Sequence, residues 1–213
     1  MSKAQDDRTV VRAMTRRAIS VSTFILAPLM MGLAFVGEPF VKLILTEKWL
    51  PSVPFMRVFC ITYMFYPIHT ANLNAIKAMG RSDLFLKLEI IKKVVGMIAL
   101  IITMNISVMA MAYSAIVTSI INQVINSWPN RKLLDYKYSD QLKDIVPNVM
   151  TAVFMGVCVM QLERLGLPNI LTLLLQIVSG AIIYAGCAHI TKNESYYYLL
   201  GMIRTRFKRI LKR

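Results

Sequence analysis

Long stretches without a charged side chain constrain this sequence more than any other feature. The longest, residues 94–130, would form about 55 Å of helix at about 1.5 Å per residue, nearly two hydrocarbon thicknesses of a membrane. Charged residues make up only 17% of the chain, and the mean hydropathy is +0.56, so the chain cannot supply the polar faces of a soluble domain. The sequence therefore predicts a polytopic membrane protein. Further uncharged stretches cover residues 18–37, 58–76, 145–162 and 165–191.

The positions of the basic residues predict the topology. Most of the 25 Lys and Arg side chains fall in four segments between the apolar stretches. Positive side chains gather in cytoplasmic loops, and six spans with both termini in the cytoplasm agree with this bias. A single helix over residues 94–130 would place two of the basic segments outside, so we predict a fold-back at Asn105–Ser107. The basic segments are residues 1–17, 77–93, 131–143 and 191–213.

The expected fold class is all-α, a helical bundle of six spans. In hydrocarbon, backbone polar groups must be satisfied within helices or closed barrels, and these stretches lack the period-2 alternation of barrel strands. We expect a basic cytoplasmic segment at 1–17, a transmembrane domain at 18–189 and a cytoplasmic amphipathic basic tail at 190–213. The spans are predicted at about residues 18–36, 55–76, 88–104, 107–127, 145–162 and 170–189.

A net charge of +14 also raises the question of nucleic-acid binding. The basic residues lie in several segments beside spans, as topology requires, and are not gathered with stacking aromatic residues in one soluble module. We therefore expect the lipid bilayer as a partner and no nucleic acid.

An enzyme is the second alternative to weigh. Carboxylate pairs for a metal ion could come from Asp6 with Asp7 or from Asp140 with Asp144, but both pairs lie on polar segments near Lys or Arg, which is typical of solvated charge. The sequence has no Gly-rich phosphate loop, Ser-His-Asp order or HExxH motif. We expect no enzymatic activity, no catalytic residue, no metal and no cofactor.

Polar side chains within the predicted spans are the candidate substrate-binding residues, because they cost free energy to bury in a membrane. Structural roles are the alternative, since Asn pairs between helices and Lys near a helix end can reach the interface. The predicted substrate-binding residues are Arg57, Asn72, Asn74, Lys92 and Lys93.

Two other polar positions have a structural interpretation. Glu89 and Lys93 are i, i+4 neighbours on one helical face. His69 lies within an apolar helix, where a histidine with satisfied hydrogen bonds is the commoner case.

Several sequence segments resemble one family, the polysaccharide flippases of the multidrug/oligosaccharidyl-lipid/polysaccharide exporter superfamily. The resemblance covers essentially the whole chain, and its most specific parts are the loop around Trp49 and the turn at Gly80–Asp83. The similar segments are SKAQDD at residues 2–7, APLMMGL at 27–33, LTEKWLPSVPFM at 45–56 and NLNAIKAMGRSDLFLKLEIIKK at 72–93.

This resemblance implies a membrane transporter of MATE-like fold. Such flippases move polyprenyl-pyrophosphate-linked oligosaccharide units across the inner membrane for surface polysaccharide and lipopolysaccharide biosynthesis, by alternating access between two helical lobes. The chain resembles the last six helices only, so an amino-terminal lobe is an expected partner. Two alternatives stay open: a non-transporting fragment or accessory membrane subunit, and a membrane enzyme of polysaccharide assembly.

Overall fold

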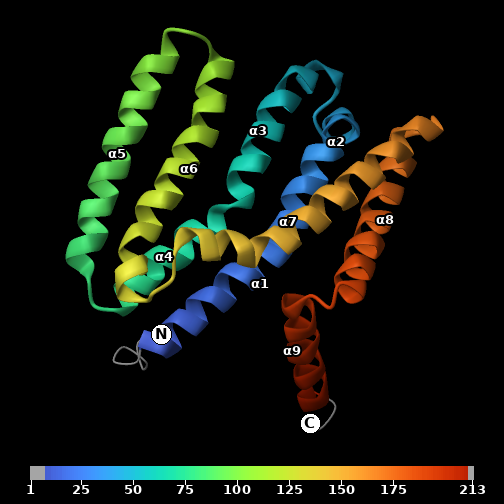
Figure 1. Ribbon diagram of the computed structural model, residues 1–213. Coiled ribbons are helices and arrows are strands. Elements are labelled where there is room, and N and C mark those ends of the chain that lie inside the picture. The colour runs from blue at the N-terminus through green and yellow to red at the C-terminus, as the bar shows by residue number, and fades with distance from the viewer. Residues whose placement is uncertain (1–7, 211–213) are drawn as a thin grey trace.

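The computed structural model describes the backbone of residues 8–210 and the side chains of residues 8–205. Within this range the chain is helical and contains no strand, which confirms the predicted all-α class (Figure 1). The helices are α1 Arg8–Phe35, α2 Gly37–Ile44, η2 Glu47–Ser52, α3 Val53–Met64, α4 Tyr66–Ala78, α5 Ser82–Met104, α6 Val108–Leu133, α7 Tyr138–Met160, η3 Gln161–Leu165, α8 Asn169–Ile190 and α9 Glu194–Ile210.

Four of the described helical segments are long and apolar enough to cross a membrane: α1, α6, α7 continued by η3, and α8. The predicted span at 55–76 is instead two short helices, because α3 ends at Met64 and Pro67 stands in the first turn of α4, where its missing N–H is tolerated. The span at 88–104 lies in α5, which carries several charged side chains in its first half. That all six segments cross the membrane stays a prediction.

α1 is the central helix of the bundle. Its buried residues include Val11, Thr15, Ile19, Thr23 and Ala27, a stripe with the i, i+4 spacing of one helix face. The helix packs along α7 and also contacts α3, α4 and α9. The described part of the predicted basic segment 1–17 is thus helical and continuous with the first span, whereas residues 1–7, with the SKAQDD motif, lie outside the described part.

Two apolar clusters hold α1 against its neighbours. One contains Ile19, Ile68 and Ile145, from α1, α4 and α7. Toward the other end, a second cluster joins α1, α7 and α8 and includes Phe24 and Tyr184, whose ring centroids are 5.0 Å apart.

α5 and α6 form an antiparallel pair that stands beside the rest of the bundle (Figure 1). The chain turns back at Asn105–Ser107, where the Ser107 hydroxyl accepts a hydrogen bond from the backbone N–H of Ala110 at 3.0 Å and caps α6. Many large apolar side chains of this pair are exposed, among them Ile98 and Ile102 on α5 and Val117 on α6. Residues 94–130 therefore form two helices with a wide apolar outer surface.

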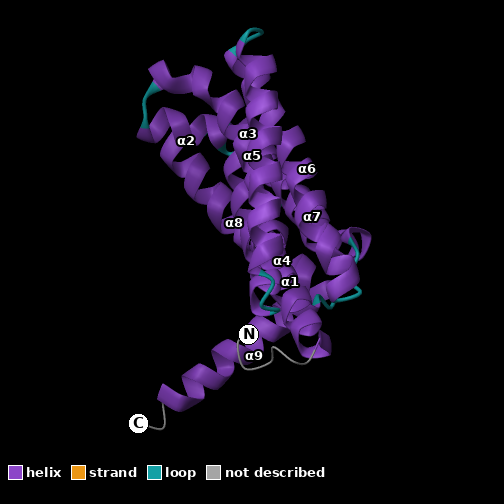
Figure 2. Cartoon of the chain, turned by 90° about the vertical axis from the view of Figure 1, so that its left-hand side faces the viewer, coloured by secondary structure: helices purple, strands orange, loops and turns teal. Residues whose placement is uncertain are grey.

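α9 leaves the bundle at the end where α1 begins. It follows α8 after a short junction in which Lys192 adopts a left-handed backbone conformation, with φ of 51°, and it projects away from the other helices (Figure 2). The predicted tail is thus helical through Ile210. The side chains beyond residue 205, which belong to this predicted amphipathic tail, lie outside the described part.

Candidate functional site

The structure does not gather the five predicted substrate-binding residues into one site. Arg57 lies near the start of α3, where its Nε donates to the backbone oxygen of Ala34 and its Nη2 donates to Glu38 Oε1, both at 3.1 Å. Its side chain is 45% exposed. Arg57 therefore ties α3 to the end of α1 and to α2.

Asn72 is fully buried in a polar core between α4, α6 and α7. Its amide nitrogen lies 2.8 Å from the Ile68 backbone oxygen, 3.2 Å from Ser127 Oγ and 2.7 Å from Gln141 Oε1. Its amide oxygen accepts from Asn130 Nδ2 at 2.6 Å and from Gln141 Nε2 at 3.1 Å. Both ends of the Asn72 side chain are thus engaged in interhelical pairing, the structural role that competed with substrate binding.

The same polar core continues along α6. Gln123, which is 3% exposed, accepts a hydrogen bond from the Tyr138 hydroxyl at 3.1 Å. Asn126 Nδ2 lies 2.6 Å from His69 Nδ1, and the His69 ring stacks on Tyr66 with centroids 5.6 Å apart. The interpretation of His69 as a satisfied histidine therefore agrees with its contacts.

The remaining three predicted residues differ in accessibility. Asn74 is exposed on α4, and Lys93 is exposed on α5. Lys92 is buried, with 6% of its side chain exposed, and donates to Glu89 three residues earlier. The Glu89 ion pair thus uses the i, i+3 neighbour Lys92, while the i, i+4 neighbour Lys93 is exposed.

A cavity of about 670 Å³ lies elsewhere, between the first half of α1, the start of α7 and the α8–α9 junction. Sequence reasoning missed it, because these three segments are far apart in the chain and each was interpreted only as a basic segment beside a span. The charged residues that line it are the basic Arg16, Arg17, Lys143 and Lys192 and the acidic Asp144 and Glu194.

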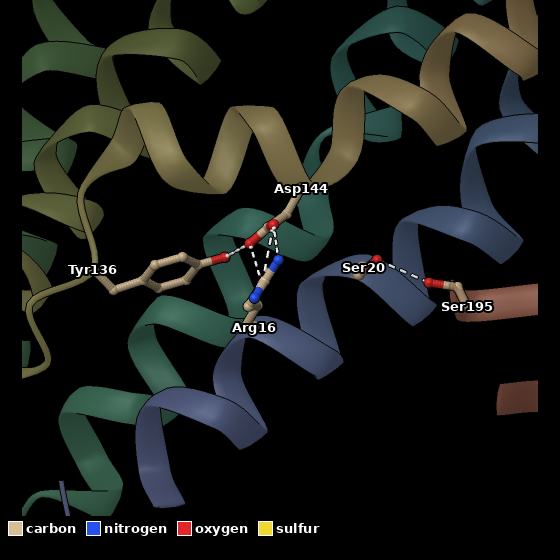
Figure 3. Close-up of polar contacts among 5 residues, drawn as sticks. All are labelled: Arg16, Ser20, Tyr136, Asp144 and Ser195. Carbon is tan, nitrogen blue, oxygen red and sulfur yellow. Dashed lines mark hydrogen bonds and ion pairs between the residues drawn. The ribbon is translucent and has the colours of Figure 1, made fainter. Parts of the chain in front are cut away.

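One wall of this cavity is an ion pair between α1 and α7 (Figure 3). Arg16 Nε donates to both carboxylate oxygens of Asp144, at 3.0 and 2.9 Å, and Arg16 Nη2 lies 2.8 Å from Oδ1. The Tyr136 hydroxyl donates to Asp144 Oδ2 at 2.7 Å. Burial and then this hydrogen bond raise the pKa of Tyr136 above its usual value, so the phenol stays protonated beside the carboxylate.

A chain of neutral hydrogen bonds forms the wall toward α9. The hydroxyls of Ser20 and Ser195 are 2.8 Å apart (Figure 3). Asn148 Nδ2 donates to the Ser20 backbone oxygen at 2.9 Å, and Asn193 Nδ2 donates to Asn148 Oδ1 at 2.7 Å. Since Asn148 is 1% and Ser195 is 3% exposed, these contacts fix the cavity wall before any ligand binds.

The cavity retains an excess of positive charge. The Arg16 charge is matched by Asp144, and the Arg17 guanidinium lies over the Tyr198 ring, 4.9 Å from its centroid. Within the described part of the chain, Lys143 and Lys192 have no carboxylate within 4.0 Å. Such an arrangement can hold an anionic group. Among the described residues, no group of three His, Cys, Asp or Glu side chains could hold a metal ion.

The sequence of the chain is similar to known proteins of polysaccharide biosynthesis. Residues 1–54 match the family described as "Polysaccharide biosynthesis protein". The chain is 22% identical over 190 residues, 86% of its length, to the teichuronic acid biosynthesis protein TuaB of Bacillus subtilis (strain 168). It is 27% identical over 101 residues, 47% of its length, to the lipopolysaccharide biosynthesis protein WzxC of Escherichia coli (strain K12).

A third relative is an uncharacterized membrane protein in the cps region of Klebsiella pneumoniae, 26% identical over 95 residues and 45% of the chain. The chain spans 39% of the length of TuaB and 20% of the length of each of the other two. No solved structure matches it significantly. The resemblance predicted from the sequence is confirmed over the matched parts, and the four long apolar helices agree with a multi-pass membrane protein of polysaccharide biosynthesis.

Proposed function

We propose that the chain is part of a membrane transporter, a flippase that moves lipid-linked oligosaccharide units across the inner membrane for surface polysaccharide biosynthesis. The similarity to TuaB and WzxC, whose names assign them to teichuronic acid and lipopolysaccharide biosynthesis, carries this proposal. The four described helical segments of span length agree with a protein that works within the membrane.

The transport unit is proposed to contain a second helical lobe that faces this chain. Alternating access needs two bodies that move against each other around a shared site. The relatives are much longer than the matched region, and the exposed apolar surface of α5 and α6 could pack against such a lobe as well as against lipid. The proposed orientation has both termini in the cytoplasm, because the basic segments then share one side.

The five residues predicted from the sequence have unequal roles in this proposal. Lys93 and Asn74 are exposed and would contact the pyrophosphate or the glycan directly. Lys92 and Arg57 would reach it by exchanging their present carboxylate partners for a phosphate. Asn72 would act by holding α4 in place, since its amide is already engaged.

Complementation tests the transport proposal. In cells that lack their own flippase, the chain expressed with its proposed second lobe should restore surface polysaccharide, and the chain alone should not. Restoration by the 213-residue chain alone would contradict the two-lobe proposal. If neither form restores it, the accessory-subunit and enzyme alternatives take precedence.

Alanine variants of the cations sharpen this test. Lys93→Ala should weaken substrate binding about ten- to a hundredfold, because a charge-assisted hydrogen bond contributes about 1.5–3 kcal/mol. Lys92→Ala and Arg57→Ala should reduce substrate affinity by less. In the wild type the carboxylate partner of each cation competes with the substrate, so each cation contributes less to binding. Lys132→Ala, an exposed cation at the end of α6, is the control. Full transport by the Lys93, Lys92 and Arg57 variants would contradict the proposed cationic contacts.

A further inference from the structure

We propose that the cavity between α1, α7 and the α8–α9 junction binds the phosphate headgroup of an anionic membrane lipid. This lipid is distinct from the transported substrate, and the proposal does not depend on transport. It rests on the depth of the cavity relative to the membrane, on its charge and on its preformed walls.

The cavity lies at the level where three helices enter the hydrocarbon. Arg16 and Arg17 directly precede the long uncharged stretch of α1, and Lys143 and Asp144 directly precede that of α7. Lys192 directly follows the uncharged stretch of α8. Since each transition from charged to uncharged sequence marks a membrane boundary, the three segments bring their cations to headgroup depth around one shared space.

The charge of the cavity suits a phosphate. With Arg16 matched by Asp144, three cations face a single further carboxylate, that of Glu194. Lys143 and Lys192 come from different helices and border the same volume, while Arg17 is held at the cavity by its contact with Tyr198. Phosphate oxygens accept hydrogen bonds from ammonium and guanidinium groups such as those of Lys143, Lys192 and Arg17.

The positive-inside rule alone does not account for this arrangement. That rule requires basic residues in the loops, but it does not require them to surround a preformed space of about 670 Å³, which is within the range of about 300–1,000 Å³ typical of ligand sites. The hydrogen bonds that join Ser20, Ser195, Asn148 and Asn193 fix that space in place.

An apolar surface beside the cavity favours a lipid over free phosphate. Val21 lines the cavity, and Ile25 and Leu29 follow it at i, i+4 spacing along α1, with 49% and 58% of their surfaces exposed. On α7, Met150 is 63% exposed one turn beyond the lining residue Pro147. An acyl chain can lie along these side chains while its phosphate occupies the basic cavity.

The test uses the purified full chain in detergent, with lipid binding measured by native mass spectrometry and by the rise in Tm on lipid addition. Phosphatidylglycerol should bind and raise Tm, while phosphatidylcholine and an equal concentration of inorganic phosphate should not. Lys143→Gln combined with Lys192→Gln should weaken phosphatidylglycerol binding about tenfold or more. Lys132→Gln combined with Lys137→Gln, which removes the same charge from exposed positions near the same end, should leave it unchanged.

Glu194→Gln removes the unmatched carboxylate and should strengthen phosphatidylglycerol binding, which tests the site even if the double lysine variant does not fold. Equal weakening by the two double variants, or equal binding of phosphatidylcholine, would overturn the proposal. Full competition by inorganic phosphate would show a soluble-anion site and would overturn the assignment to a lipid.

Discussion

The polar core and the basic cavity lie on neighbouring helices, but their polar side chains differ in burial and in pairing. In the polar core, Asn72, Asn130 and Gln141 are uncharged and fully buried. Asn130 and Gln141 each bond to Asn72, while the Asn130 side-chain oxygen has no hydrogen-bond partner among the described residues. In the basic cavity, Lys143 and Lys192 are exposed, and among the described residues no carboxylate lies within 4.0 Å of either. Neutral amides can satisfy each other inside a bundle, whereas unmatched cations remain open to a ligand.

This difference separates structural from functional polarity in a chain where five polar side chains within the predicted spans were the functional candidates. A buried amide that pairs on both sides joins helices, because leaving it unpaired in an apolar interior costs free energy. An exposed cation at a span boundary costs little and retains its capacity to bind. The comparison makes three predictions, which differ in the size of the expected effect.

The prediction with the largest effect concerns the side of the membrane on which each segment lies. Because the cavity brings together residues from α1, α7 and the α8–α9 junction, all three must lie on one side of the membrane. Reporter fusions after Tyr138 and after Thr191 should therefore both report cytoplasm, and a fusion after Pro51 should report the outer side.

A periplasmic signal at Tyr138 would contradict the six-span topology. It would mean that α5 and α6 do not both cross the membrane, and it would remove the shared headgroup depth on which the lipid proposal rests. The fusion after Pro51 is the internal control, since it lies at the opposite end of α3 from the polar core.

A smaller effect is expected from breaking the polar core. Asn72→Leu would leave the buried amides of Asn130 and Gln141 without their main partner, and each buried unsatisfied group costs about 1–3 kcal/mol. We expect a loss of about 2–4 kcal/mol in the free energy of unfolding, measured by denaturant titration in detergent. Asn74→Leu is the matched control on the same helix and should change it little, because Asn74 is exposed.

An equal loss in both variants would mean that the measurement reports general damage to α4 and not the polar core. If Asn72→Leu leaves the free energy of unfolding unchanged, the distinction between the two regions fails, because the amides of Asn130 and Gln141 would then find other partners at no cost.

The sequence predicted the class of the fold because apolar length and charge placement are local properties. Charge placement also predicted the turn at Asn105–Ser107, because a single helix over residues 94–130 would have placed two basic segments outside the cell. The break between α3 and α4 was missed, although Pro67 marks it, because the uncharged stretch at 58–76 was long enough for one span.

The sites were harder to predict, because their partners lie far apart in sequence. Asn72 stood out as a polar residue in a span, but its partner Gln141 lies between two predicted spans and gave no signal. The basic cavity joins residues more than a hundred positions apart, such as Arg16 and Asp144. Spacing along one helix shows which residues share a face, but it does not show which face of another helix they meet.

The smallest effect concerns Tyr136, which borders both regions through Asp144 and Gln141. Tyr136→Phe removes one hydrogen bond to a carboxylate and should cost about 1.5 kcal/mol in the free energy of unfolding at neutral pH. In the wild type, the raised pKa of folded Tyr136 means that its stabilising contribution is complete below about pH 10. It is lost as pH rises further, because only the unfolded state releases that proton readily.

The phenylalanine variant has no such proton, so the difference in the free energy of unfolding between the two proteins should narrow above about pH 10. Chemical unfolding at pH 8 and pH 11 measures this change. A difference that stays constant across this range would show that Tyr136 ionises equally in both states, and the Arg16–Asp144 pair would then not need a protonated phenol beside it.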